Sequence, residues 1–499
     1  MQIEANHTEG HLKRELKSRH LTMIAIGGAI GTGLFMASGA SISQAGPIGA
    51  LIAYLVIGIM LYFLMTSLGE MSTYMPSSGA FETYATKFVD PALGFALGWN
   101  YWFGWAITVA VEIAAVSLLM KYWFPDSPAI LWSSLFLAVL FGLNLLPPRA
   151  YGESEFWFAG IKVMTIIIFL IVGTLMIVGI IGGKAIGFQN FMMEGAMFHG
   201  GLMSVIGVFI MAGFSFIGTE LVGVAAGESE NPEKNVPKAI KSVFWRILIF
   251  YIFTILIIGF VIPYNDPNLL NGSDNVAISP FTLLFEKAGL AFAAAVMNAV
   301  ILTSVLSCGN SSIYAASRML YAMAKSGKAP KLFGKINSRG VPIYAVCATT
   351  VIGATCFLSS LYGDGTIYIW LLNSSALTGF ISWLGIAVSH YRFRKAFVAQ
   401  GRDLNELKYK AKWFPLGPIF SFVLCSFVIL GQNYDAIFNG IIDWHGIAVS
   451  YIGLPLFLVL YIGYKVTKRT KVVPLNEVDL SREYHARVSV EKEDHRNHA

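Results

Sequence analysis

Long apolar runs recur along the whole chain, and they constrain its fold more than any other feature. A helix of roughly 20 apolar residues spans the hydrocarbon core of a bilayer, which is about 30 Å thick. Of the 499 residues, 56% are hydrophobic and only 13% are charged, so we predict an all-α integral membrane protein. The apolar runs lie near residues 21–44, 49–75, 93–120, 129–146, 156–183, 202–226, 243–263, 290–320, 342–361, 367–390, 415–432 and 446–464. They predict twelve transmembrane helices.

The distribution of positive charge predicts the orientation. Lys and Arg gather in residues 13–19, 325–339, 392–412 and 465–471. With twelve spans, these segments fall on one side of the membrane, and positive charge marks the cytoplasmic side. We therefore expect both termini in the cytoplasm and the protein in the plasma (inner) membrane. The formal net charge of +6 is explained by these clusters beside anionic lipid, so no nucleic-acid partner is expected.

Glycines interrupt two of the apolar runs. The first interruption is "GGAIGTGLF", residues 27–35, and the second is "AGFSFIGTELVGVAAGE", residues 212–228. Small residues also let neighbouring helices pack closely, which is the alternative explanation for either motif taken alone. Two interruptions five helices apart instead indicate an inverted-repeat transporter, in which broken helices form the substrate site near the membrane midplane.

An unwound helix exposes backbone groups that suit a zwitterion. The half-helix that begins after Thr32 presents free N–H groups and the positive end of its dipole, which favour a carboxylate. The preceding half-helix presents free carbonyl groups, which favour an ammonium group. An amino acid carries both groups on one carbon, so the sequence predicts an amino-acid substrate.

Four ionisable side chains lie within apolar runs, where such groups are costly and by default functional. They are Glu70, Glu112, Lys162 and Glu220. Glu70 lies near a helix end, where solvation or packing on a neighbour would explain it. Glu220 directly follows the second interruption, so it can organise the unwound backbone or relay a proton.

The motifs around these residues resemble the amino-acid permeases of the amino acid, polyamine and organocation (APC) superfamily, and most closely the bacterial lysine-specific permeases. Among the matching stretches are "RHLTMIAIGGAIGTGLF", "FLMTSLGEM", "GFSFIGTELVGVAAGESENP" and "WLLNSSALTGFISWLGIAVSHYRFR". The resemblance implies two five-helix inverted repeats with unwound first and sixth helices, followed by two further helices. The implied divisions are a cytoplasmic tail (1–20), the first repeat (21–183), the second repeat (202–390), two further helices (415–464) and a solvent-exposed cytoplasmic tail (472–499).

The resemblance also implies roles for individual residues. The unwound backbone would hold the zwitterion, through Ile26, Gly31, Thr32, Gly33, Phe214 and Gly218. Of these, residues 31–33 match positions that hold the substrate carboxylate. Backbone carbonyls beside Ile26 and Phe214 match positions that hold the amine, and the Phe214 ring matches an aromatic residue that closes over the substrate.

A lysine substrate adds a second positive charge, and burying it without a carboxylate would cost several kcal/mol. We expect Glu112 to face the ε-ammonium, with Ser374, Ser375 and Thr378 of the tenth helix as polar companions. Glu220 is the alternative acid.

Lys162 matches a lysine that replaces a sodium ion beside the unwound first helix in proton-coupled members of the superfamily. The resemblance therefore assigns Lys162 to proton coupling, and Glu220 is the second proton-coupling candidate because of its position after the interruption. Snorkelling of Lys162 from a helix end is the structural alternative.

Taken with these residues, the resemblance implies a secondary transporter that imports a basic amino acid, L-lysine, by proton symport with alternating access. The alternatives are a permease for arginine or a neutral amino acid, an exchanger, and a permease-fold nutrient sensor. An enzyme is not expected, because the loops contain no nucleophile with a base and no phosphate loop. No cofactor or metal is expected either, since the four cysteines lie in apolar runs without ligand spacing. A regulatory protein partner is left open.

The predicted topology places Leu270 outside the cell and Lys331 inside. We expect a membrane-impermeant maleimide to label Leu270→Cys in intact cells and Lys331→Cys only after permeabilisation. Each cysteine is introduced into a chain whose four native cysteines are replaced. Labelling of Leu270→Cys only after permeabilisation would contradict the topology.

Overall fold

The computed structural model describes residues 23, 30–77, 79–146, 148–226, 229, 231–269, 279–432 and 444–481. In these ranges the regular elements are all helices, without a β-strand, which confirms the all-α part of the predicted fold class. In chain order they are α2 (Thr32–Phe35), α3 (Ala37–Tyr74), α4 (Ala80–Phe88), α5 (Pro91–Met120), α6 (Ala129–Leu143), α7 (Pro148–Ile177), α8 (Gly201–Phe216), α9 (Leu221–Ala225), α10 (Pro232–Arg246), η2 (Ile247–Ile252), α11 (Phe253–Val261), α12 (Pro280–Lys287), α13 (Ala291–Lys325), η3 (Lys331–Gly334), α14 (Ile343–Gly353), η4 (Ala354–Leu358), α15 (Ser359–Tyr362), α16 (Asp364–Ala399), η5 (Leu404–Glu406), α17 (Leu416–Gly431), α19 (Trp444–Tyr451), α20 (Gly453–Lys468) and η6 (Leu475–Glu477).

The helices have the lengths that a membrane requires. Within the described ranges, nine helical stretches are long and apolar enough to cross a bilayer, and two shorter apolar helices, α6 and α17, accompany them. α3 consists of two helices, because Gly46 has φ 71° and ψ 170° and Pro47 follows it. The predicted runs 21–44 and 49–75 meet at this kink.

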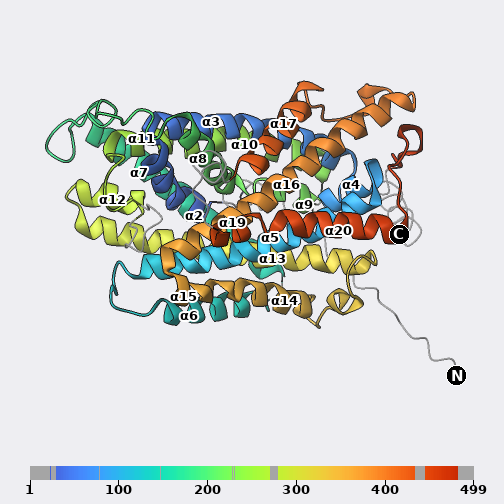
Figure 1. Ribbon diagram of the computed structural model, residues 1–499, viewed down its shortest axis with the longest axis horizontal. Coiled ribbons are helices and arrows are strands. Elements are labelled where there is room, and N and C mark those ends of the chain that lie inside the picture. The colour runs from blue at the N-terminus through green and yellow to red at the C-terminus, as the bar shows by residue number, and fades with distance from the viewer. Residues whose placement is uncertain are drawn as a thin grey trace, which may run out of the picture.

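The helices run side by side along the long axis of the molecule (Figure 1), and α5 packs against both α13 and α16. In the most apolar window of α5, 94% of the residues are buried, whereas the share for α20 is 11%. α5 is therefore a core helix, and α20 is peripheral. Outward side chains such as Ile171 on α7 and Val459 on α20 are apolar and exposed, as contact with lipid tails requires.

Side-chain caps fix the start of two helices. The Asp90 carboxylate accepts the backbone N–H of Ala92 at 2.9 Å at the start of α5. Ser279 caps α12, and its hydroxyl also donates to the carbonyl of Phe35 at 2.6 Å, which ties α12 to α2. The short helices α4 and α12 are not among the helices predicted from the apolar runs, because each is only two to three turns long.

The basic segments that follow α13, α16 and α20 lie at one end of the bundle, near α4 at the right of Figure 1. Lys328 forms an ion pair with Glu82 of α4. Lys465 forms another with Asp90, directly after α4. Their common location agrees with the prediction that these segments share one side of the membrane.

The segment that follows α20 packs against the bundle, which corrects the expectation of a solvent-exposed C-terminal tail. Leu480 is 3% exposed, and its carbonyl accepts the Tyr74 hydroxyl at 2.9 Å. Asp479 pairs with Lys87 at 2.9 Å. Partial burial acts to raise the pKa of Asp479, but hydrogen bonds to the carboxylate and the Lys87 ammonium lower it to about 2, so the pair persists at neutral pH. Residues 482–499 lie outside the described residues.

The kink in α3 depends on Gly46. A Cβ there would lie 1.8 Å from the carbonyl oxygen of Ala196, and the positive φ is one that L-residues rarely adopt. We expect Gly46→Ala to cost more than about 2 kcal/mol and to lower the melting temperature of the solubilised protein. Gly142→Ala is the control, since a Cβ at that position meets nothing within 4 Å. An unchanged melting temperature for Gly46→Ala would contradict the kink.

Candidate functional site

The second glycine-rich run contains the interruption predicted from the sequence. α8 ends at Phe216, α9 begins at Leu221, and residues 217–220 between them form turns. Gly218 has φ 94°, a conformation that favours glycine. Its N–H donates to both carboxylate oxygens of Glu220, each at 3.1 Å. Glu220, which is 2% exposed, thus satisfies a backbone group that unwinding frees.

The first glycine-rich run is described from Ile30 onward, so Ile26 lies outside the described residues. Gly31 precedes α2 with φ −138° and ψ −146°, which is not helical. α2 ends at Phe35, and Met36 separates it from α3 with φ −123° and ψ −52°. The chain is therefore irregular at the start of this half-helix and again one turn later.

The two interrupted helices touch each other. The Ser215 hydroxyl on α8 donates to the Gly33 carbonyl at 2.7 Å, and the Tyr54 hydroxyl lies 2.9 Å from the Ser215 oxygen. A Cβ on Gly33 would lie 2.5 Å from the Cα of Ser215. Glycine is therefore required at this position because the two backbones approach so closely.

The Glu112 side chain, on α5, contacts the N-terminal end of α2. Its carboxylate accepts the backbone N–H of Thr32 at 3.3 Å and the Thr32 hydroxyl at 3.2 Å. A Cβ on Gly31 would lie 2.6 Å from a Glu112 carboxylate oxygen, so glycine makes room for the acid. In this conformation Glu112 occupies the N–H group that the sequence suggested for a substrate carboxylate.

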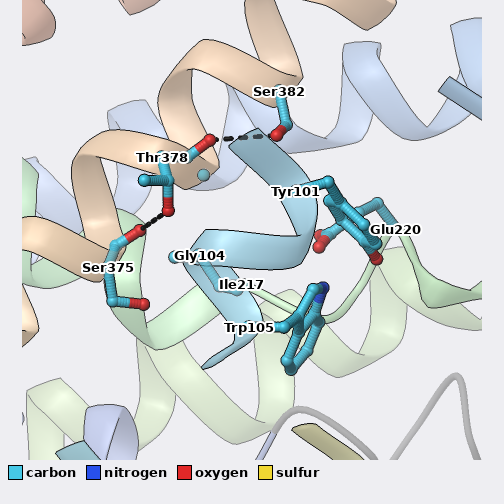
Figure 2. A pocket seen from close by; sticks show the side chains of 9 residues that line it. Tyr101, Gly104, Trp105, Ile217, Glu220, Ser375, Thr378 and Ser382 are labelled. Atoms are coloured by element: carbon cyan, nitrogen blue, oxygen red, sulfur yellow. Dashed lines mark hydrogen bonds between the residues drawn. The ribbon is translucent and has the colours of Figure 1, made fainter. Parts of the chain in front are cut away.

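A small cavity lies beside the second interruption, between α5 and α16 (Figure 2). It is lined by Tyr101, Gly104, Trp105, Ile217, Glu220, Ser375, Thr378, Gly379 and Ser382. Figure 2 shows the hydroxyls of Ser375 and Thr378 on one side, with Tyr101 and Glu220 on the other. The cavity measures about 10 Å³, which is room for one water molecule and too little for an amino acid. This cavity is therefore closed to an amino acid in this conformation.

Hydroxyl groups connect α16 to α5 at this cavity. The Thr108 and Ser375 oxygens lie 2.7 Å apart, and the Thr378 hydroxyl donates to the Ser375 carbonyl at 2.7 Å. A Cβ on Gly104 would lie 2.2 Å from the Thr378 hydroxyl oxygen, so α5 approaches α16 closely here. Ser374 is buried, and its hydroxyl has no hydrogen-bond partner among the described residues.

The structure separates the candidate residues into two groups. The first group, around the start of α2, consists of Gly31, Thr32, Gly33 and Glu112. The second group, at the cavity and the adjoining turn, consists of Gly218, Glu220, Ser375 and Thr378. Phe214 and Ser374 are buried but do not line the cavity.

Sequence reasoning missed the contribution of α5 to the cavity. Tyr101 and Trp105 both line it, with Gly104 between them. The spacing i, i+3, i+4 places these three residues on one face of a helix, and that was the available signal. Because α5 is apolar on all sides, its hydrophobic pattern does not distinguish this face from the others.

Lys162 is fully buried, which excludes snorkelling to a helix end. Its Nζ lies 3.6 Å from a carboxylate oxygen of Glu155, which is 1% exposed. The other Glu155 oxygen accepts the Ser307 hydroxyl of α13 at 2.7 Å. Glu155 was missed, although its position seven residues before Lys162 places both on one face of α7.

Glu70 has a structural environment. Its carboxylate accepts Arg394 Nε at 2.5 Å and the backbone N–H of Ala411 at 2.7 Å. These contacts join α3, α16 and the segment before α17. Packing on a neighbouring helix, one of the two structural explanations given above for Glu70, therefore accounts for its burial.

Comparison with known proteins gives a consistent family. The family described as amino acid permease matches residues 20–477. The chain is 59% identical to the lysine-specific permease LysP of Escherichia coli (strain K12), over 94% of this chain and 96% of the relative. It is 52% identical to the lysine-specific permease LysP of Lactococcus lactis subsp. cremoris (strain MG1363), over 95% and 94% of the two chains. The histidine permease HisP of the same Lactococcus strain is 50% identical, over 95% and 99%.

Proposed function

Because this chain belongs to the amino acid permease family, we propose that it imports L-lysine across the plasma membrane by proton symport. Its apolar helices make it a multi-pass membrane protein, and its family makes it a transporter rather than an enzyme. Lysine is the proposed substrate because two close relatives are named lysine-specific permeases. The observation that carries the proposal is the buried carboxylate of Glu220 in a cavity lined with hydroxyl groups.

The proposed architecture has twelve spans. Nine long stretches, two shorter helices and the division of α3 at Gly46 together give that number. The first five and the next five spans would form the inverted repeat, with interruptions in the first and sixth. Both termini would be cytoplasmic, since the described basic segments share one end of the bundle.

The zwitterionic end of the substrate would bind to the unwound backbone. The N–H groups of residues 31–33 begin a half-helix and suit the carboxylate. In the closed conformation the Thr32 N–H is bound to Glu112, so the substrate carboxylate has to share or displace that contact. Backbone carbonyls near Ile26 and Phe214 are the proposed acceptors for the amine.

The ε-ammonium needs a carboxylate, because a dehydrated and unpaired charge costs several kcal/mol. Glu220 meets this need, since it lines the cavity with Ser375 and Thr378. The N–H of Gly218 and the indole N–H of Trp383, the latter at 3.3 Å, hold its carboxylate in place. N–H donors orient the carboxylate and carry no full positive charge themselves, which leaves it available for a cationic ligand.

Glu112, the acid expected from the sequence, is the alternative. It does not line the cavity, but it lies beside the backbone that would hold the zwitterion. The closed cavity supports alternating access, because a lysine can enter only after α5 and α16 separate from the second interruption.

Paired substitutions distinguish the two acids. If Glu220 binds the ε-ammonium, Glu220→Gln should weaken lysine binding about 100-fold, or about 3 kcal/mol. Binding of L-norleucine, which lacks the ε-amine, should change little. Glu112→Gln should then affect both ligands equally. Calorimetry on purified protein measures the affinities, and melting temperatures show whether each variant is folded. A loss selective for lysine in Glu112→Gln alone would move the assignment to Glu112.

The histidine permease among the relatives supports a second candidate, import of another amino acid on the same scaffold. Competition of lysine uptake by arginine, histidine and neutral amino acids in proteoliposomes decides the substrate. Uptake that requires an internal amino acid would indicate an exchanger. Binding without any uptake would indicate a nutrient sensor.

Proton coupling is assigned to Lys162 and its newly identified partner Glu155. Both are buried, and their charged atoms lie 3.6 Å apart. Transfer of a proton within such a pair removes both charges together, so neither is left bare in a medium of low dielectric constant. Glu220 is the second candidate proton site, because it is buried beside the substrate cavity.

Replacing Lys162 alone would leave Glu155 buried without its cation, at a cost of about 3–5 kcal/mol. The double variant Glu155→Gln/Lys162→Gln avoids this cost. We expect it to fold, to bind lysine and to catalyse lysine counterflow in proteoliposomes, while losing accumulation driven by a pH gradient. Lys162→Gln alone should show a lower melting temperature.

Two outcomes would contradict the coupling scheme. Accumulation at the wild-type level by the double variant would remove the pair from the coupling role. Wild-type protein that does not respond to an imposed pH gradient would rule out proton symport.

A further inference from the structure

A second and larger cavity opens between α6, α7 and α13, away from the candidate substrate site. Its volume is about 500 Å³. The residues that line it include Leu140, Phe158, Thr303, Asn310, Tyr314 and Arg318. None of its lining residues lines the cavity beside Glu220. It is therefore a separate site with its own chemistry.

This cavity opens toward the surrounding membrane. Val139, Leu143 and Leu146 line it and are 43%, 44% and 45% exposed. They belong to α6 and the turn that follows it, where exposed leucine and valine side chains suit contact with lipid tails. A hydrocarbon chain can therefore enter the cavity sideways from the bilayer.

Arg318 is the exceptional member of the lining, because it is a buried cation that forms no ion pair with any residue that the structure describes. It is 6% exposed, and its Nε is buried without a hydrogen-bond partner among the described residues. The guanidinium carbon lies 3.4 Å from the centroid of the Tyr314 ring, a cation–π contact that offsets only part of the dehydration cost. An arginine that served topology alone would be solvated, as Lys325 is at the end of the same helix.

The positive charge of Arg318 indicates which kind of ligand this cavity would bind. An apolar wall with one buried cation matches a molecule that has an anionic head and a hydrocarbon tail. A lysine substrate does not fit, since its positive side chain would be repelled by Arg318. Free phosphate would satisfy the guanidinium but would leave the apolar wall uncovered.

We propose that this cavity binds an anionic phospholipid of the cytoplasmic leaflet, with its phosphate at Arg318 and an acyl chain along α6. The leaflet rests on the orientation proposed above, in which the C-terminal end of α13 is cytoplasmic. Ser307 also lines the cavity and donates to Glu155, the partner of Lys162. The bound lipid would therefore lie one hydrogen bond away from the proposed coupling pair.

Lipid binding can be measured without transport, so its failure is distinct from failure of the proposed function. Delipidated full-length protein in detergent is titrated with phosphatidylglycerol, with phosphatidylcholine of the same acyl chains, or with inorganic phosphate. Native mass spectrometry counts the bound lipid, and the melting temperature is recorded. We expect phosphatidylglycerol to raise the melting temperature by about 4 °C and to bind about 10-fold more tightly than phosphatidylcholine.

Variants locate the effect in the cavity. Arg318→Gln should abolish the preference for phosphatidylglycerol, and Arg318→Lys should keep part of it. Lys325→Gln, which removes an exposed charge from the same helix, should keep all of it. Thr303→Trp fills the apolar part of the cavity and retains Arg318, so its expected loss of binding tests the site even if Arg318→Gln fails to fold.

Several results would overturn the proposal. Equal binding of the two lipids would indicate a neutral lipid groove. A rise in melting temperature with inorganic phosphate alone would indicate an anion site without a lipid. Unchanged binding of phosphatidylglycerol to Thr303→Trp would place the lipid elsewhere on the protein.

Discussion

In the centre of the bundle the Ser215 hydroxyl donates to the Gly33 carbonyl at 2.7 Å, and the two interrupted helices meet there. Backbone groups cannot be left unpaired inside a membrane protein, so each interruption needs side chains that satisfy what unwinding frees. Glu112 accepts an N–H at the first interruption, and Glu220 accepts one at the second. The same two carboxylates are the acids proposed above to lie beside the substrate.

The other buried charges are held differently, and the difference separates structure from function. Glu70 is matched by the guanidinium of Arg394, a cation that is always charged, which makes a permanent link between helices. Lys162 lies 3.6 Å from Glu155, and this buried pair is the proposed site of proton coupling. Glu220 accepts hydrogen bonds from the N–H of Gly218 and the indole of Trp383, and Glu112 accepts them from Thr32.

A few hydrogen bonds beside the cavity hold α5 against α16. The Thr108 and Ser375 oxygens lie 2.7 Å apart, and Asn100 donates to the Thr378 carbonyl at 2.8 Å, so these contacts would have to break if α5 separated from α16. Each such hydrogen bond contributes about 1 kcal/mol net, so substrate binding can supply the free energy for opening.

The sequence by itself determined the helical membrane architecture, the interruption between α8 and α9 and the family, because apolar length and glycine placement act locally along the chain. It also singled out the acids and Lys162, since any charge in an apolar run is conspicuous. Only the tertiary structure decided what each buried charge contacts. Glu155 lies beside Lys162, Glu112 accepts the Thr32 N–H of α2, and Glu220 lines the cavity with Tyr101. A helix that is apolar on every side carries no periodicity to show which face turns inward, so these pairings arise from packing alone.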